Sequence, residues 1–118
     1  MVRSFSEAER KSGRTLMAAL ECFKELRSTM PMQYVITFLL VADEEGLTVG
    51  DYAKKAGVAG SVMSRHLLDL SVHQRTKTGA GFAIIETRQN LKNLREHTVH
   101  LTDKGRALFH RIHRVVER

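Results

Sequence analysis

Serine and arginine side chains recur at helical spacing after residue 60. Ser61 and Arg65 are four residues apart and would share one side of a helix, with Val62 and Ser64 beside them. A guanidinium group makes bidentate contacts with a guanine edge or clamps a phosphate, and hydroxyl groups contact phosphate oxygens. Side chains of these types at this spacing are therefore able to contact double-stranded DNA. The alternative is an arginine that is solvated on the surface.

More cationic side chains follow further along the chain. Arg75 and Lys77 lie in a polar stretch, and Arg88, Lys92 and Arg95 lie in a basic span. We expect Arg88 and Lys92 to contact phosphates. We expect Arg75 and Lys77 either to contact the DNA backbone or to lie in a disordered loop.

The charge is distributed unevenly along the chain. Residues 1–64 contain eight Lys or Arg and eight Asp or Glu, whereas residues 65–118 contain eleven and five, so the second part carries the whole formal net charge of +6. All six histidines also lie there. A one-sided positive charge favours a polyanion as partner, because neutralised phosphates release condensed counterions. A basic solvated surface is the alternative.

No catalytic, cofactor-binding or metal-binding constellation is expected. His110 and His113 are three residues apart on a predicted helix, whereas His97 and His100 would point to opposite faces of a strand. The sequence contains no Cys-x-x-Cys pair and no glycine-rich phosphate-binding motif. We predict that the protein is not an enzyme. The histidines would lie on the surface or face DNA, where binding would strengthen as the pH falls, and Cys22 would be buried and inert.

Two helices are predicted before the serine and arginine pattern. The first runs from about 7 to 27 and begins at a capping box formed by Ser6 and Glu9. The second runs from about 32 to 44, with Pro31 at its start, and is apolar nearly all round, so it should lie in the middle of the core. The apolar face of the first helix would consist of Leu16, Leu20, Phe23 and Leu26.

Two short helices joined by a tight turn are predicted next. Thr48 and Asp51 are typical of a helix start, and Gly57 would end that helix in a left-handed turn. Ser61 is a good N-cap for a further helix that runs to about residue 70. The inward side of this further helix would consist of Met63, Leu67 and Leu70.

The rest of the chain is predicted to form a hairpin and a final helix. Residues 82–87 and 97–101 are rich in strand formers and flank the polar span 88–96. Residues 71–81 should form a loop, and Thr102 would cap a helix that runs to the end. This order predicts a single domain, mainly α with a small antiparallel β-hairpin, which is a winged helix-turn-helix.

Four stretches of the sequence resemble the MarR family of regulators. In the family's order, they match its buried helix, its L-T-V-x-x-L-A-x-x-x-G helix, its recognition helix and its wing signature that ends in L-T-x-x-G. These stretches are residues 31–41, 47–57, 61–67 and 93–106. The resemblance implies a recognition helix in the major groove. It also implies that Arg95 enters the minor groove, where a narrow groove concentrates negative potential.

The chain departs from the family pattern at four places. Asn93 stands where the family has an aspartate that pairs with the wing arginine, so it offers only a neutral hydrogen bond. A mobile, solvated hairpin tip is the alternative for this region. The loop 71–81 is longer than the family's link, and Leu68 faces outward where a polar residue is usual. Because the sequence ends at Arg118, we expect the family's last dimerisation helix to be absent.

The resemblance implies a homodimer formed through the N- and C-terminal helices. We expect residues 1–30 to form a dimerisation helix, 31–101 the winged helix-turn-helix core and 102–118 the C-terminal helix. A two-fold dimer would place two recognition helices about 34 Å apart, one turn of DNA, on a pseudo-palindromic operator. A monomer that closes its own core is the alternative.

Length and composition indicate how many domains the chain forms and argue against a membrane-spanning or secreted protein. A chain of 118 residues with 42% hydrophobic content forms one domain with a core. No apolar stretch approaches the length of a membrane span, and the N-terminus lacks the apolar run of a secretory signal. A single cysteine makes no internal disulfide, so a cytoplasmic location is expected.

These observations together predict a sequence-specific DNA-binding transcriptional regulator, most simply a repressor that occupies an operator. One alternative is a protein-interaction module whose basic half binds an acidic partner. Another is a nonspecific DNA-binding accessory protein of a plasmid or phage. The resemblance leaves a small-molecule effector and a redox role for Cys22 open.

Overall fold

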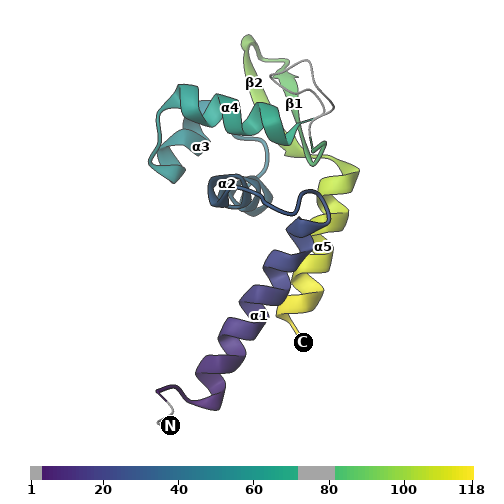
Figure 1. The fold of residues 1–118 in the computed structure, drawn as a ribbon. Helices are drawn as coiled ribbons and strands as arrows, with labels where there is room; N and C mark the ends of the chain where they lie inside the picture. The colour runs from purple at the N-terminus through teal and green to yellow at the C-terminus, as the bar shows by residue number, and fades with distance from the viewer. Residues whose placement is uncertain (1–3, 72–81) are drawn as a thin grey trace.

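Two long helices project from a lobe of three shorter helices and a β-hairpin in the computed structural model, which describes residues 4–71 and 82–118 (Figure 1). We call the side-by-side pair α1 and α5 the stalk, and we call the remaining elements the lobe. In chain order the elements are α1 (Glu7–Lys24), α2 (Met32–Asp43), α3 (Val49–Ala56), α4 (Gly60–Leu70), β1 (Ile85–Asn90), β2 (Asn93–Leu101) and α5 (Asp103–Val116).

This architecture confirms the predicted fold class, mainly α with one antiparallel hairpin. The predictions for Arg75 and Lys77, with nearly all of the loop 71–81, lie outside the described residues. Within residues 4–71 and 82–118, none of the helices has the length and apolar character needed to cross a bilayer.

Local hydrogen bonds start two helices where the sequence predicts. At α1, the Ser6 N–H donates to Glu9 Oε1 (2.8 Å) and the Glu9 N–H donates to Ser6 Oγ (3.1 Å). Thr48 and Asp51 exchange the same pair of hydrogen bonds at the start of α3. Gly57, at φ 70°, ends α3 in the left-handed conformation that glycine adopts without strain. These capping predictions are confirmed, although α1 ends earlier than predicted.

The start of α4 differs from the prediction. Ala59 is the N-cap, because its backbone is extended and its carbonyl accepts hydrogen bonds from the N–H groups of Val62 (3.1 Å) and Met63 (3.0 Å). Ser61 is therefore already inside the helix, and its predicted role as N-cap is wrong. Its exposed hydroxyl is not engaged as a cap of α4.

The core joins the lobe to the stalk around Phe38 of α2. The Phe38 ring is fully buried and lies edge-on to Phe23 of α1 and Phe109 of α5, at centroid distances of 5.7 and 6.5 Å. Burial of such large apolar side chains is the main favourable contribution to folding. One side of α2 lies outside this core, so the prediction of a helix buried all round is wrong. The exposed apolar residues of α2 are Met32, Ile36 and Leu39.

The predicted apolar face of α1 is also only partly covered. Phe23 is buried and Leu26 is half-buried against the core. Leu16 and Leu20, which the helical spacing places on the same face, remain exposed together with Met17. The stalk therefore keeps an apolar surface that the described chain does not cover.

The hairpin is longer, and its turn is tighter, than predicted. The strands pair antiparallel from Ile85 opposite Leu101 outward. At the far end the register shifts, so that Asn90 lies opposite Asn93 and residues 94–96 bulge out of β2. Residues 88–90 and 93 of the polar span predicted to separate the strands are thus paired, because backbone groups pair whatever the polarity of their side chains.

A close backbone approach fixes the start of α5. Thr102 Oγ1 accepts from the Gly105 N–H (3.1 Å), as the predicted cap, and the Thr102 N–H donates to the Ile84 carbonyl (3.2 Å). Gly105 packs so tightly there that a Cβ atom would lie 2.0 Å from the Ile84 oxygen. The Ile84 N–H in turn donates to the carbonyl of Leu70 (3.0 Å). Ile84 therefore connects the end of α4 to the start of α5.

Replacing Gly105 by alanine is expected to destabilise the protein, because the added methyl group would force the backbones of α5 and residue 84 apart. Overpacking of this kind costs about 1–3 kcal/mol. Gly13→Ala is the control: it lies inside α1 with open space around it, so the higher helix propensity of alanine should stabilise the fold by about 1 kcal/mol. Urea unfolding measures both changes. Equal stability of Gly105→Ala and the wild type would contradict the close approach.

Candidate nucleic-acid interface

One side of α4 is buried and the other is exposed. The exposed side presents Ser61, Ser64 and Arg65 to solvent, and Val62 is half-buried at its edge. This is the arrangement that the spacing of the apolar residues predicts. The buried side consists of Met63, His66, Leu67 and Leu70.

Two tyrosines hold the helices of the lobe in place. The Tyr34 hydroxyl on α2 donates to the Asp69 carboxylate of α4, and the Tyr34 ring lies 5.2 Å from the His66 ring between centroids. The Tyr52 hydroxyl on α3 donates to the Glu44 carbonyl (2.7 Å), and burial raises the pKa of Tyr52. These contacts are not predictable from the sequence, because no short-range spacing relates the partners.

A groove of about 580 Å³ lies between α4 and the hairpin. Leu68 lies on its α4 wall and is exposed, as predicted. Glu86 and His97 lie on the wall formed by the hairpin. The exposed side of α4 and the hairpin therefore flank one surface.

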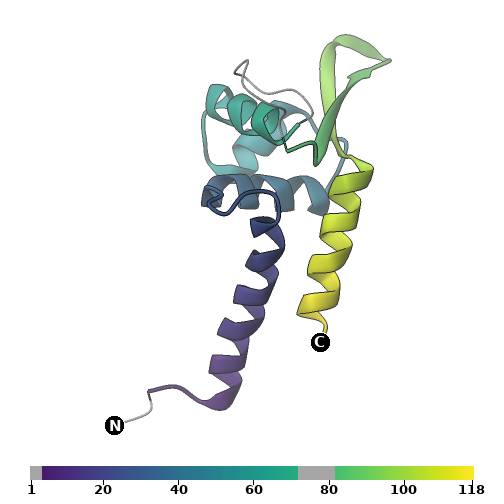
Figure 2. The ribbon, with the colours of Figure 1, turned by 45° about the vertical axis from the view of Figure 1, so that its right-hand side comes forward.

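The hairpin extends away from the rest of the lobe (Figure 2). It carries three cationic side chains that the sequence predicts to contact DNA, and each has different surroundings. Arg88 forms an ion pair with Glu86 (2.8 Å). Lys92 is exposed in the turn, where its N–H donates to Asn90 Oδ1 (2.9 Å). Arg95 is exposed in the bulge, and no hydrogen bond or ion pair to its guanidinium group is found among the described residues. Lys92 and Arg95 thus present their charge at the far end of the hairpin.

Two asparagines shape the tip of the hairpin. Asn93 Oδ1 accepts a hydrogen bond from the backbone N–H of Arg95 (3.2 Å), and Asn90 Nδ2 donates to Glu96 Oε1 (2.9 Å). The neutral hydrogen bond of Asn93 is therefore made to the backbone of Arg95 and not to its guanidinium group. Leu91 in the turn is 89% exposed, so the tip is partly apolar.

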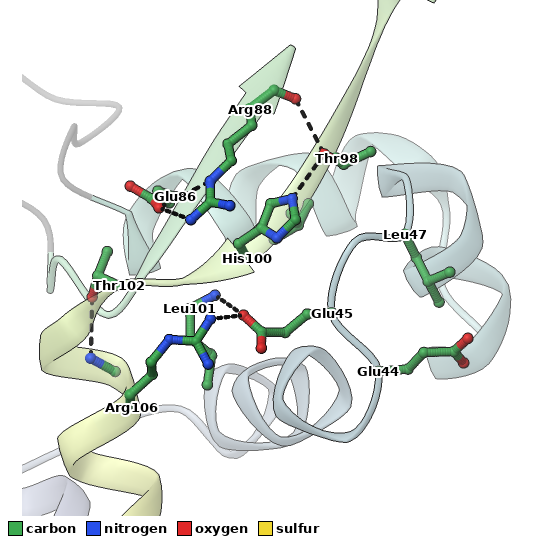
Figure 3. A network of polar contacts seen from close by, with 12 residues as sticks. Glu44, Glu45, Leu47, Glu86, Arg88, Thr98, His100, Leu101, Thr102 and Arg106 are labelled. Atoms are coloured by element: carbon green, nitrogen blue, oxygen red, sulfur yellow. Dashed lines mark hydrogen bonds and ion pairs between the residues drawn. The ribbon is translucent and has the colours of Figure 1, made fainter. Parts of the chain in front are cut away.

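The base of the hairpin contains a polar network that the sequence analysis missed (Figure 3). Glu45 Oε1 accepts hydrogen bonds from the Leu101 N–H and from the Arg106 guanidinium group, each at 2.8 Å. Burial raises the pKa of Glu45, but the two donors together lower it by more than burial raises it. The net pKa of Glu45 therefore lies below the ordinary value of 4.5. Nothing in the sequence relates Glu45 to partners so far away along the chain.

His100 lies in the same network. Its Nε2 atom lies 2.9 Å from Thr98 Oγ1. Burial, followed by the nearby Arg88 charge, lowers the pKa of His100 from its ordinary value of 6.5. The neutral form of His100 is therefore favoured over its charged form more than in an exposed histidine.

Two of the histidines considered in the sequence, His110 and His113, and the cysteine lie apart from this surface. His110 and His113 are exposed on α5. Across the described ranges, no group of three or more His, Cys, Asp or Glu is arranged to hold a metal ion. Cys22 is half-buried rather than fully buried, and its Sγ lies 3.7 Å from the Ala18 carbonyl oxygen.

Comparison with known proteins identifies the fold of this chain. No family model matches the chain, and no curated protein matches its sequence. Among solved structures, the DNA complex of Staphylococcus aureus MepR matches 95% of this chain and 84% of its own, with 18% identity and a TM-score of 0.71. A MarR-family transcriptional regulator from Silicibacter pomeroyi matches 93% and 66%, with 20% identity and a TM-score of 0.58. The chain has the MarR fold.

The transcriptional repressor CouR, bound to a 23-mer DNA duplex, has the same fold. It matches 93% of this chain and 70% of its own, with 23% identity and a TM-score of 0.62. The MarR fold contains the helix-turn-helix and wing that the four sequence stretches predict. In this chain they are α3, α4 and the β1–β2 hairpin, which we call the recognition helix (α4) and the wing (β1–β2) from here on.

The capping box of α3 gives a pH-dependent prediction, since α3 supports the recognition helix. Hydrogen bonds from the Thr48 backbone and side chain lower the pKa of Asp51 below 3.8. Its charged form is therefore favoured in the folded state, and this stabilisation is present above pH 3.8 and lost as the pH falls through the lowered pKa. Asp51→Asn should reduce the melting temperature at pH 7.

The difference in melting temperature between wild type and Asp51→Asn should shrink as the pH falls below 3.8, because the wild-type carboxylate is then protonated. Glu9→Gln, at the equivalent position of the α1 capping box, should behave in the same way, because the pKa of Glu9 is lowered for the same reason. Thermal melts across pH measure both variants. A difference that is the same at every pH would argue against a role for the charge.

Proposed function

We propose that this protein is a sequence-specific transcriptional regulator that binds double-stranded DNA in the cytoplasm and represses by occupying an operator. The observation that carries the proposal is the exposed side of the recognition helix, where Ser61, Ser64 and Arg65 face solvent beside the basic wing. The MarR fold and the one-sided positive charge support it. CouR and MepR were solved as complexes with DNA.

Each residue of the surface has a distinct role in the proposal. Arg65 reads a guanine edge or clamps a phosphate in the major groove, where base edges carry a full donor and acceptor code. Ser61 and Ser64 contact phosphate oxygens, and half-buried Val62 lies at the edge of the contact. The cations Arg75 and Lys77, outside the described residues, add backbone contacts.

The wing completes the proposed contact. Arg95 enters the minor groove and Lys92 contacts a phosphate, since both side chains are exposed at the far end of the hairpin. Arg88 contributes less to binding than its charge suggests, because Glu86 already neutralises it. An arginine in the minor groove also makes binding sensitive to groove width.

We propose that the regulator is a homodimer whose partner covers the exposed apolar side of the stalk. Leu16 and Met17 of α1 are each 60% exposed, and a groove of about 720 Å³ continues this surface from Leu20 to Met32 and Val35. Exposed apolar patches of this extent on a soluble chain mark interaction sites. A second copy related by a two-fold axis covers the same patch on both subunits.

Arg65→Ala is expected to weaken binding to the best duplex by about 1–3 kcal/mol if Arg65 reads a base. The best duplex is found first by in vitro selection of bound sequences. Fluorescence anisotropy across salt concentrations then measures affinity, which should fall steeply with salt in the wild type. The control is Lys11→Ala, which removes an exposed positive charge from α1 and should leave affinity unchanged. Unchanged affinity of Arg65→Ala would remove Arg65 from the contact.

In vitro selection also separates the proposal from its alternatives. A specific regulator enriches one motif, with half-sites about one DNA turn, or 34 Å, apart. A protein that binds selected and random duplexes equally is a nonspecific DNA-binding protein. A chain that binds neither, but retains a protein partner after nuclease treatment, is an interaction module.

Leu16→Glu is expected to convert the dimer into monomers, because the new charge would be buried without a partner between subunits. Leu16→Met keeps the apolar surface and should remain dimeric. Sedimentation velocity reports the mass of each variant, and the monomeric variant should lose affinity for a two-half-site duplex. A wild type that sediments as a monomer at every concentration would overturn the dimer.

A further inference from the structure

The carboxylate of Glu45 lies where three parts of the molecule meet (Figure 3). Glu45 itself belongs to the segment between α2 and α3. One of its oxygens accepts from the N–H of Leu101, the last residue of β2, and from the guanidinium group of Arg106 in α5. The side chain therefore connects the segment between α2 and α3, the wing and the stalk at one atom.

The Glu45 carboxylate extends a hydrogen-bond ladder along β2. The Gly46 N–H donates to the Val99 carbonyl (2.8 Å), and the Val99 N–H donates to the Leu47 carbonyl (3.0 Å). Two residues further along the same edge of β2, the Leu101 N–H donates to the Glu45 carboxylate in place of a backbone carbonyl. Hydrogen bonds to a charged acceptor are stronger than neutral ones. The base of β2 is thus held on both edges, by β1 and by this segment.

The direction of the wing is set at this base. Beyond it the two strands extend away from the rest of the lobe (Figure 2), and they carry Lys92 and Arg95 at their far end. A small rotation at Leu101 would move that far end by several times the displacement at the base. Arg106 limits such a rotation, because it ties the same oxygen to the first turns of α5.

We propose that Glu45 is a positioning residue for the wing: with Arg106, it fixes the direction in which the hairpin presents Arg95 relative to the recognition helix. The inference rests on the proposed function, since the position of Arg95 matters only if both elements contact one duplex. Glu45 does not itself touch DNA in this account. Its effect on affinity passes through the wing.

A merely structural ion pair is the competing account, and a double-mutant cycle separates the two. Glu45→Gln keeps an acceptor for the Leu101 N–H but removes the charge that holds Arg106. If Glu45 positions the wing, Glu45→Gln should weaken duplex binding about fivefold in the wild type and in Arg65→Ala. It should have almost no effect in Arg95→Ala, because the contact it positions is already gone. Equal losses in all three backgrounds, or no loss in any, overturn the proposal.

The matched control is Glu25→Gln, which breaks the ion pair between Glu25 and Arg111 within the stalk. This pair does not contact the wing, so Glu25→Gln should leave affinity unchanged in every background. Thermal melts establish that each variant is folded. If Glu45→Gln does not fold, Arg106→Gln takes its place in the cycle, since it leaves the hydrogen bond between Glu45 and Leu101 intact.

Hydrogen exchange gives a readout that needs no DNA. Glu45→Gln should raise the exchange rates of the Val99 and Leu101 amides and of the paired wing strands, whereas Glu25→Gln should not. A wild type that binds no duplex contradicts the proposed function alone, and hydrogen exchange then decides whether Glu45 holds the wing. Unchanged exchange in Glu45→Gln overturns the positioning role even if DNA binding is confirmed.

Discussion

Burial of three residues fixes the rotation of α4 about its own axis. Met63, Leu67 and Leu70 face the core of the lobe and are almost completely buried. With that side turned inward, the helical repeat places Ser61 and Arg65 outside. Exposing the apolar side instead would cost about 1.5–3 kcal/mol for each large side chain, which exceeds what surface polar groups contribute. Packing in the core therefore decides which residues are available to a duplex.

Backbone hydrogen bonds relate the wing to the recognition helix. Ile84 is fully buried, donates to the end of α4 and accepts from the start of α5. Glu45 and the segment that follows it hold the other edge of β2. These bonds join α4, the hairpin and the stalk at one junction. Gly105 is required at this junction, since any side chain there would collide with Ile84.

Local patterns in the sequence were sufficient for the helices and for the orientation of α4. The capping boxes at Ser6 and Thr48 depend on residues three positions apart, and the buried side of α4 depends on a repeat within one helix. The hairpin was predicted with the wrong bounds, because its outer strands are polar and the bulge at 94–96 depends on register. Ser61 was wrongly predicted as the N-cap because serine is a common N-cap residue. The N-cap is Ala59, whose side chain makes no capping hydrogen bond.

Contacts between distant segments could not be predicted from the sequence. The pairing of Glu45 with Leu101 and Arg106, and that of Tyr34 with Asp69, depend on how the elements pack. Gly105 appeared in the sequence only as part of a wing signature, and its physical role became clear from the position of Ile84. The exposed apolar side of α2 was likewise expected to be in the core, because periodicity shows which face is apolar but not what covers it.

The most direct test of the account follows backbone amide signals by NMR while a selected duplex is added. The account predicts that residues 61–65 of the recognition helix and 91–95 of the wing shift first and most strongly, and that the first turns of α1, residues 7–14, do not respond. Shifts confined to the stalk or to the groove beside Leu68, with residues 61–65 unchanged at saturating duplex, would contradict it.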